Sequence, residues 1–545
     1  MRLDQLVSQR IHKYLLLIIA IWLIVAGWHP FYLGFFTDDW ALFILRASEL
    51  SVLESIKHYP NFPQSLLHAG IDPSIATNRP VYAFILFGLK LALGDSVFAW
   101  QTASALFLLV AACSVFYLAT TLLKQLQYKE ADSHFGAILA ALIYLVGPWS
   151  VVMSAWPTVA ITLLSQIFVI VGLTLLISTR MQNPFRASLL ILIGFLTYEA
   201  YWLLFVPVTI FLCAINRWRL HDYLKFIGAI FGVLILALLI KVGLSKIWGV
   251  PGKVFFYNFL PLFFQNLIAY PRVVADALRP IPIKYFGGAM LMIVIFSHIT
   301  GGGGCRRSLA LLSALCAGLA SSALLYAAAG YGLAGAGIMS RTLAAQNVYF
   351  SLFVVVTMMP VVTIICSMQG YGFREILSQS TKNVVLLLVC GAFVFLVSIL
   401  SISTILRSHE WSVLWNAEVS ALKLFPYEKL LDDMDRTKGR TTVIIQIDED
   451  TRGEIFGASY DMGPALVWMY PELRDLVESR KLTFLVGRES EWATVWDGKR
   501  IIQKWCNNSA VVTSVDAVKV LYIGLSLDGI TRYHDYDANH MTGCR

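Results

Sequence analysis

Long apolar runs fill the first three quarters of the chain, and charged residues or Gly and Pro separate each run from the next. A helix needs roughly 20 apolar residues to cross a bilayer. About eleven runs come close enough to this length to predict spans; they are residues 14–33, 97–123, 135–149, 159–178, 187–198, 201–215, 226–247, 285–299, 309–329, 347–366 and 384–406. The shorter run 80–93 is expected to be a juxtamembrane or re-entrant segment. The sequence therefore predicts a polytopic α-helical membrane protein.

Charged residues are concentrated near the end of the chain. Only 14% of all residues are charged, whereas about 25% is usual in soluble domains. This composition excludes a soluble enzyme and a disordered or nucleic-acid-binding chain. Half of the charged side chains lie in residues 407–545, so we expect a membrane part over 1–406 and a soluble α/β domain over 407–545. That domain is expected to help hold a bound acceptor, and its predicted elements are a helix at 409–434, strands at 441–447, 482–486, 510–515 and 519–525, and a helix at 464–479.

The distribution of Lys and Arg among the short loops predicts the orientation. One alternating set of loops is basic throughout, beginning with Arg2, Arg10 and Lys13 at the N-terminus. Loops of this kind face the cytoplasm. The N-terminus is then cytoplasmic, and an odd number of spans puts the C-terminal domain outside the cytoplasmic (inner) membrane. The outer side also carries three long loops, 34–96, 248–284 and 330–346. A disulfide between Cys506 and Cys544 would be permitted there but is left open.

Three carboxylates stand out near the predicted outer boundary. Asp38 and Asp39 are adjacent just after the first apolar run, where two neighbouring charges are costly unless cations pair with them or they take part in chemistry. A simple alternative is that Thr37 or Asp38 caps a helix through residues 40–50. Glu199 lies at the tip of a short helical hairpin, where it is either functional or faces lipid headgroups.

Basic residues at the same boundary oppose the positive-inside trend. A guanidinium grips phosphate oxygens in a bidentate manner, so these side chains suit a lipid phosphate, with a simple headgroup contact as the alternative. Arg79 and Arg341 are distinctive because each opens an apolar run; the other basic residues at this boundary include Lys241 and Lys246. Aromatic rings on this side suit sugar faces, although an interfacial belt also explains them; the candidates are Trp40, Tyr82, Tyr198 and Trp202.

The order of these features resembles that of a known superfamily. One span, an outer loop that begins with an acidic pair, the segment Asn78-Arg79-Pro80-Val81-Tyr82, the segment Leu93-Gly94-Asp95-Ser96 and a span ending in Lys124 resemble the GT-C membrane glycosyltransferases. Residues 195–207 resemble a segment of the phage-type serotype-converting glucosyltransferases. The resemblance covers about the first 215 residues and hardly reaches the C-terminal part.

The resemblance implies a glycosyltransferase that moves a sugar from a polyprenyl-phosphate-linked donor with inversion. The acceptor would be an extracytoplasmic glycan or a lipid-linked oligosaccharide, and the enzyme would also contact membrane lipids. Asp38 or Asp39 would be the general base, with Glu199 a further candidate, and Arg79, Arg341 and Lys246 would bind the donor phosphate. Members that use a divalent metal supply another carboxylate after the third span, but residues 151–157 contain none. We therefore expect no metal cofactor.

Other kinds of membrane protein compete with this hypothesis. An O-antigen polymerase or ligase would also use a lipid-linked sugar. A lipid or solute transporter would need polar or broken helices near the middle of the membrane. A non-catalytic assembly or receptor-like protein would explain an exported domain but would leave the acidic pair and the outer cations without a role.

Overall fold

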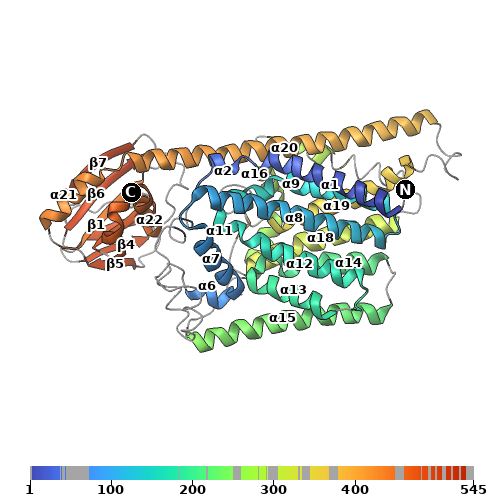
Figure 1. Ribbon diagram of the computed structural model, residues 1–545, viewed down its shortest axis with the longest axis horizontal. Coiled ribbons are helices and arrows are strands. Elements are labelled where there is room, and N and C mark those ends of the chain that lie inside the picture. The colour runs from blue at the N-terminus through green and yellow to red at the C-terminus, as the bar shows by residue number, and fades with distance from the viewer. Residues whose placement is uncertain are drawn as a thin grey trace. The chain divides into compact units, whose positions relative to one another are not determined.

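Figure 1 shows the computed structural model of the chain. It describes residues 3–36, 39, 43, 73–182, 184–215, 219–249, 259–279, 281–285, 287–289, 291, 305–328, 332–333, 344–366, 379–437, 439–447, 459–479, 481–488, 492–496, 500–505, 511–516, 519–526 and 529–535. Seven residues named from the sequence lie outside this set: Arg2, Thr37, Asp38, Trp40, Arg341, Cys506 and Cys544.

The described chain folds as two compact units. The first contains Met1–Phe31, Pro73–Leu86 and Trp100–His409, and the second contains Tyr32–Asp72, Phe87–Ala99 and Glu410–Arg545. The helices up to residue 423 are α1 (Leu3–Val25), α2 (His29–Tyr32), α6 (Pro73–Asn78), α7 (Pro80–Leu93), α8 (Val97–Gln125), α9 (Glu130–Leu145), η1 (Pro148–Ser150), α10 (Val151–Ala155), α11 (Pro157–Ala160), α12 (Thr162–Ser178), α13 (Pro184–Thr197), η2 (Glu199–Leu204), α14 (Phe205–Ile215), α15 (Leu220–Trp248), α16 (Phe259–Leu278), α18 (Cys305–Ala328), α19 (Ala344–Cys366) and α20 (Gln379–Lys423).

Five helical segments among the described residues are long and apolar enough to cross a membrane: His12–Tyr32, Val97–Gln125, Pro157–Ser178, Leu220–Trp248 and Gly391–Lys423. Shorter apolar helices lie between them in sequence, including Pro80–Leu93 and Pro184–Thr197. The prediction of a helical membrane protein is therefore confirmed. The count of eleven spans stays a prediction.

Two helices differ from the sequence-based expectation. Helix α16 lies inside the segment that we predicted as an outer loop, because Asn266, Pro271 and Asp276 interrupt its apolar pattern without preventing a helix. Helix α20 is 45 residues long and continues past Arg407, where the sequence suggested a boundary. Only the polarity of the side chains changes at Arg407. No Gly or Pro lies between Gly391 and Pro426, so no residue in this stretch breaks the helix.

Small residues bring neighbouring helices of the first unit close together. Helix α12 packs along α13, α9 packs on α19, and α14 packs on α18 (Figure 1). A Cβ atom placed on Gly194 of α13 would lie 2.7 Å from Val169 Cγ2 and 3.0 Å from the carbonyl oxygen of Ser165, both on α12. Close approach of this kind is typical of membrane helices, where van der Waals contact drives packing.

The chain between α9 and α12 is broken into short helical pieces, and distant side chains satisfy its backbone. Pro148 has no N–H to donate to the carbonyl oxygen of Tyr144 four residues earlier, and the Asn347 amide nitrogen donates to that oxygen instead, at 2.7 Å. Three further side chains bind carbonyls of this stretch in the same way: Thr404 donates to Val146 (2.6 Å), Gln101 to Ala155 (2.9 Å) and Tyr82 to Thr158 (3.0 Å). These buried polar side chains therefore hold the interrupted segment in place.

The described residues of the second unit form two sheets. In the first, the order is β2-β1-β6-β7, with β1 parallel to β2 and β6, and β7 antiparallel to β6; the other is the antiparallel sheet β3-β4-β5. Val443, Ile444 and Ile445 of β1 are all buried, as expected for a central strand with both faces covered. The remaining elements are α21 (Tyr427–Thr437), β1 (Thr441–Ile447), α22 (Ser459–Met469), η4 (Pro471–Leu473), α23 (Arg474–Glu478), β2 (Leu482–Arg488), β3 (Trp492–Trp496), β4 (Arg500–Trp505), β5 (Val511–Asp516), β6 (Lys519–Ser526) and β7 (Gly529–Asp535).

The packing of α12 on α13 generates a test. Gly194→Ala should lower the stability of the detergent-solubilised protein by about 1–3 kcal/mol, because the added methyl group meets backbone atoms of α12. Gly228→Ala on α15 is the matched control, since no described atom lies within 4 Å of its Cβ position. Thermal unfolding measures both variants. Equal unfolding temperatures would show that the α12–α13 contact is wrong.

Candidate functional site

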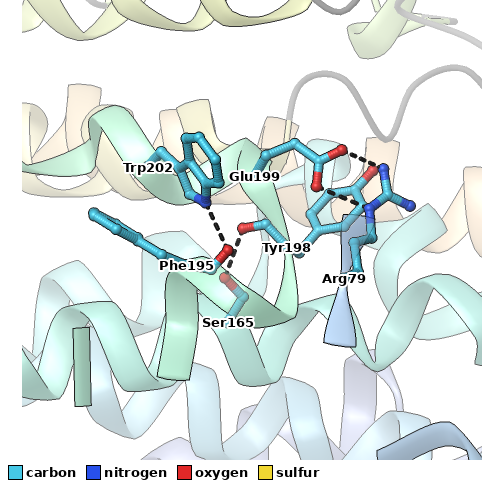
Figure 2. A network of polar contacts seen from close by, with 6 residues as sticks. All are labelled: Arg79, Ser165, Phe195, Tyr198, Glu199 and Trp202. Atoms are coloured by element: carbon cyan, nitrogen blue, oxygen red, sulfur yellow. Dashed lines mark hydrogen bonds and ion pairs between the residues drawn. The ribbon is translucent and has the colours of Figure 1, made fainter. Parts of the chain in front are cut away.

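A bidentate ion pair joins two of the residues that the sequence singles out. Arg79 lies between α6 and α7, and Glu199 is the first residue of η2. Arg79 Nε lies 2.8 Å from Glu199 Oε2, and Arg79 Nη2 lies 2.5 Å from Glu199 Oε1 (Figure 2). The two side chains are 22% and 13% exposed, so the pair is largely shielded from solvent. The fork geometry is the one in which an Arg–carboxylate contact is strongest.

Local hydrogen bonds fix the segment that carries Glu199. Tyr198 is extended between α13 and η2, with φ −159° and ψ 134°. The Ser165 hydroxyl lies within hydrogen-bonding distance of the carbonyl oxygens of Gly194 (2.8 Å) and Tyr198 (3.0 Å). The indole Nε1 of Trp202 donates to the carbonyl oxygen of Phe195 at 2.8 Å (Figure 2). These bonds satisfy carbonyl oxygens at the C-terminal end of α13 and fix the turn that follows, so that Glu199 points at Arg79.

Two aromatic rings of the same segment make cation–π contacts. The guanidinium carbon of Arg79 lies 4.3 Å from the ring centroid of Tyr198. Lys241, on α15, places its Nζ 4.4 Å from the ring centroid of Trp202. Its charge also interacts favourably with Glu199. Two described cations thus share this carboxylate, and aromatic faces stabilise both.

Glu199 lies outside the five long apolar helices, and its charge state follows from its neighbours. Burial alone would raise the pKa of the Glu199 carboxyl, but the charge and hydrogen bonds of Arg79, with a smaller contribution from Lys241, lower it below the usual range. Glu199 is therefore ionised at neutral pH. The cluster of Arg79, Lys241 and Glu199, which we call the Arg79 cluster, then has an excess of positive charge.

Asp39 belongs to the second unit, and both its side chain and its backbone form hydrogen bonds with Phe36, three residues earlier. The Phe36 N–H donates to Asp39 Oδ2 at 3.0 Å, while the Asp39 N–H donates to the carbonyl oxygen of Phe36 at 3.0 Å. The Asp39 side chain is buried. This reciprocal pattern resembles the second half of a capping box. A local capping role therefore applies to Asp39, whereas the sequence-based alternative named Thr37 or Asp38.

The other predicted contacts are distributed more widely. Tyr82 is buried and uses its hydroxyl to bind Thr158, and Trp202 is likewise buried against α13. Lys246 is exposed on the last turn of α15. The structure thus brings together Arg79, Tyr198, Glu199 and Trp202. It adds Lys241, which the sequence does not distinguish from its basic neighbours.

Comparison of the chain with protein-family models, with curated proteins and with solved structures finds no match. The chemistry that can be assigned to the Arg79 cluster therefore depends on its own residues. A largely buried cluster with two cations and one carboxylate is suited to receive an anion, because a bound negative charge would balance it.

The ion pair generates a stability prediction. Glu199→Gln keeps the shape of the side chain but leaves Arg79 without its charged partner, so it should destabilise the protein by about 2 kcal/mol or more. Because the pKa of Glu199 is lowered in the folded protein, this contribution is full above the ordinary carboxyl pKa of about 4.3 and is lost as the pH falls below it. The difference between the two proteins should therefore shrink on acidification.

Glu130→Gln is the control for this measurement. It breaks the Lys124–Glu130 pair, in which the side chains are 47% and 55% exposed, and such surface pairs contribute about 1 kcal/mol or less. Thermal unfolding at neutral and acidic pH compares the variants. If Glu199→Gln lowers the stability by no more than Glu130→Gln does, the Arg79–Glu199 ion pair does not stabilise the folded protein.

Proposed function

We propose that this chain is a GT-C-type membrane glycosyltransferase of the cytoplasmic membrane. It transfers a sugar from a polyprenyl-phosphate-linked donor to an extracytoplasmic glycan or lipid-linked acceptor. The observation that carries the proposal is the Arg79 cluster, a shielded excess of positive charge in a helical membrane protein. In this proposal eleven spans put residues 407–545 outside the cytoplasm as a soluble domain, and the reaction takes place at that outer face.

The Arg79 cluster supports a role in binding the donor phosphate. Glu199 engages the Nε and Nη2 edge of the guanidinium, so the Nη1 side of Arg79 is the edge that a phosphate would meet. The Lys241 ammonium supplies a second charge with three N–H donors. Glu199 then orients the cations and is not the base, because a carboxylate with a lowered pKa is a weak proton acceptor. In this proposal Arg341 and Lys246 add to the phosphate contacts.

We assign the general base to Asp38. Asp39 is buried and its carboxylate binds the Phe36 N–H, whereas a base must reach the acceptor hydroxyl. Asp38 takes the proton of the acceptor hydroxyl while the oxygen of that hydroxyl bonds to the anomeric carbon of the donor sugar. The bond from that carbon to the phosphate oxygen breaks with inversion, and polyprenyl phosphate leaves with the electron pair. The cations stabilise the charge that develops on this phosphate, so the mechanism needs no metal.

The interrupted helices between Pro148 and Ala160 favour one competing function. Broken helices with polar side chains are typical of transporter binding sites. Here four of the polar side chains near the breaks, Asn347, Thr404, Gln101 and Tyr82, bind backbone carbonyls of the protein itself. This use in holding the fold supports the enzyme over the transporter. A polymerase or ligase that uses a lipid-linked sugar shares the proposed donor chemistry and stays the nearest alternative.

Purified protein assayed with polyprenyl-phosphate-linked and nucleotide-linked sugars tests the proposal. Transfer is expected only from the lipid-linked donors, and EDTA should leave the rate unchanged. Asp38→Asn should lower turnover by about 10²-fold or more, because it removes the proton acceptor. Asp39→Asn is the matched control and should lose less, since its amide oxygen can still accept from the Phe36 N–H. Transfer from nucleotide sugars alone, or full activity in Asp38→Asn, would contradict the assignment.

A further inference from the structure

We propose that the C-terminal end of α8 carries a binding site for a phospholipid with a primary ammonium headgroup. This proposal goes beyond the glycosyltransferase function and does not depend on it. A cavity of about 430 Å³ lies where α8 and α12 end and α9 begins, and all three helices belong to the first unit. Its volume is in the range of about 300–1,000 Å³ that is usual for small-ligand sites.

A pair of opposite charges lines this cavity. Lys124 Nζ lies 3.1 Å from Glu130 Oε1, and the two side chains are 47% and 55% exposed. The contact uses one of the three N–H donors of the ammonium group and one of the two carboxylate oxygens. Lys124 can therefore bind a phosphate while Glu130 binds an ammonium group. A zwitterionic headgroup carries both of these charges and leaves the net charge of the cavity unchanged.

Three hydroxyl groups in the cavity lining favour a ligand that donates hydrogen bonds. Each donates its own hydrogen to a backbone carbonyl oxygen of the same helix, at 2.9 Å for Thr120, 3.0 Å for Thr121 and 3.2 Å for Ser178. A hydroxyl has a single hydrogen, so these groups offer only lone pairs to a ligand. With the Glu130 carboxylate they form a set of acceptors. Such a set suits a primary ammonium group, which has three N–H donors.

The imidazole of His134 is a further polar group of the cavity wall. His134 is only 8% exposed. Its ring stacks on Phe116, with the centroids 6.2 Å apart, and contacts the Tyr14 ring edge-on at 6.5 Å. Within the part of the chain that the structure describes, the imidazole has no hydrogen-bond partner, whereas buried polar groups normally have one. A phosphate oxygen bound beside Lys124 would supply this partner.

An exposed apolar stripe on α8 leads to the cavity. Leu106, Val110 and Tyr117 are 45%, 48% and 53% exposed, and their spacing along α8 puts them on one face of the helix. Thr121 and Lys124 continue this face into the cavity. The stripe rises by about 16 Å, close to half of the roughly 30 Å hydrocarbon core of a bilayer. Acyl chains would therefore lie along the stripe, with the headgroup in the cavity.

The lining favours a zwitterionic lipid over an anionic one. Lys129 and Arg180 are close to the cavity in sequence but do not line it, and their charges would attract anionic lipids to this side of the membrane. Inside the cavity, however, Glu130 already balances the charge of Lys124. A phosphatidylglycerol headgroup would bring a second negative charge beside Glu130 with no cation to compensate it. Phosphatidylethanolamine supplies that cation.

Lipid binding by the purified full-length protein tests the proposal. Delipidated protein in detergent is mixed with equal amounts of phosphatidylethanolamine, phosphatidylcholine and phosphatidylglycerol that have the same acyl chains, and native mass spectrometry measures each bound lipid. Wild type should bind phosphatidylethanolamine about fivefold or more tightly than either competitor, because phosphatidylcholine lacks the N–H donors and phosphatidylglycerol lacks the cation. The unfolding temperature in each lipid provides a second readout, since a bound lipid stabilises the folded protein.

Two variants separate the contributions of the two charges. Glu130→Gln should reduce the preference for phosphatidylethanolamine over phosphatidylcholine to less than about twofold, because the ammonium group loses its charged partner. Lys124→Gln should weaken the binding of both lipids by about threefold or more, because both have a phosphate. Asp132→Asn is the matched control: this acid lies in the same first turn of α9 but does not line the cavity, so the lipid preference should be that of wild type.

Three outcomes would overturn the proposal. They are equal binding of phosphatidylethanolamine and phosphatidylcholine by wild type, a preference for phosphatidylglycerol, and a preference for phosphatidylethanolamine that survives in Glu130→Gln. None of these measurements uses the sugar-transfer reaction. A protein that transfers no sugar but shows the Glu130-dependent preference would therefore refute the proposed enzyme and support the lipid site.

Discussion

The structure depends on one constraint of the bilayer: every backbone polar group buried in it needs a partner within the protein. The constraint is most severe where the chain cannot continue as a helix, as at Pro148. There the Asn347 amide takes the place of the missing N–H at the Tyr144 carbonyl oxygen, and Gln101 and Thr404 bind neighbouring carbonyls. Each such bond joins helices that are far apart in sequence. The buried polar side chains therefore serve as ties between the helices.

The same constraint builds the Arg79 cluster. The carbonyl oxygens at the end of α13 are bound by Ser165 and by the indole of Trp202, which fixes the turn through Tyr198. Glu199 then emerges at a defined position and meets Arg79 in a bidentate contact, and Lys241 lies over Trp202 nearby. Largely shielded charges interact strongly, so an unbalanced positive charge in this place is costly unless an anion joins it. This cost is the physical basis of the proposed phosphate site.

The sequence predicts the parts of the fold that composition and breakers determine. The apolar runs predict the helical membrane protein, and Pro80 marks the start of α7, whose bounds agree with the predicted short run. Helix α16 escapes prediction because packing, and not a uniform apolar pattern, stabilises it. Strands β3, β4 and β7 escape because polar and aromatic residues mix along them without regular alternation. For the site, the sequence identifies Arg79 and Glu199 separately. It does not predict that they pair across 120 residues, because that contact depends on tertiary packing.

Lys241 tests the central claim most directly, since it contributes charge to the Arg79 cluster without being part of the ion pair. The binding of polyprenyl phosphate to the purified protein can be measured by native mass spectrometry. Lys241→Gln should weaken binding by about tenfold or more, the equivalent of one charge-assisted hydrogen bond. Lys225→Gln, an exposed lysine on the same helix, should leave it unchanged. If both variants bind polyprenyl phosphate as wild type does, or wild type binds none, the Arg79 cluster is a structural ion pair and not a phosphate site.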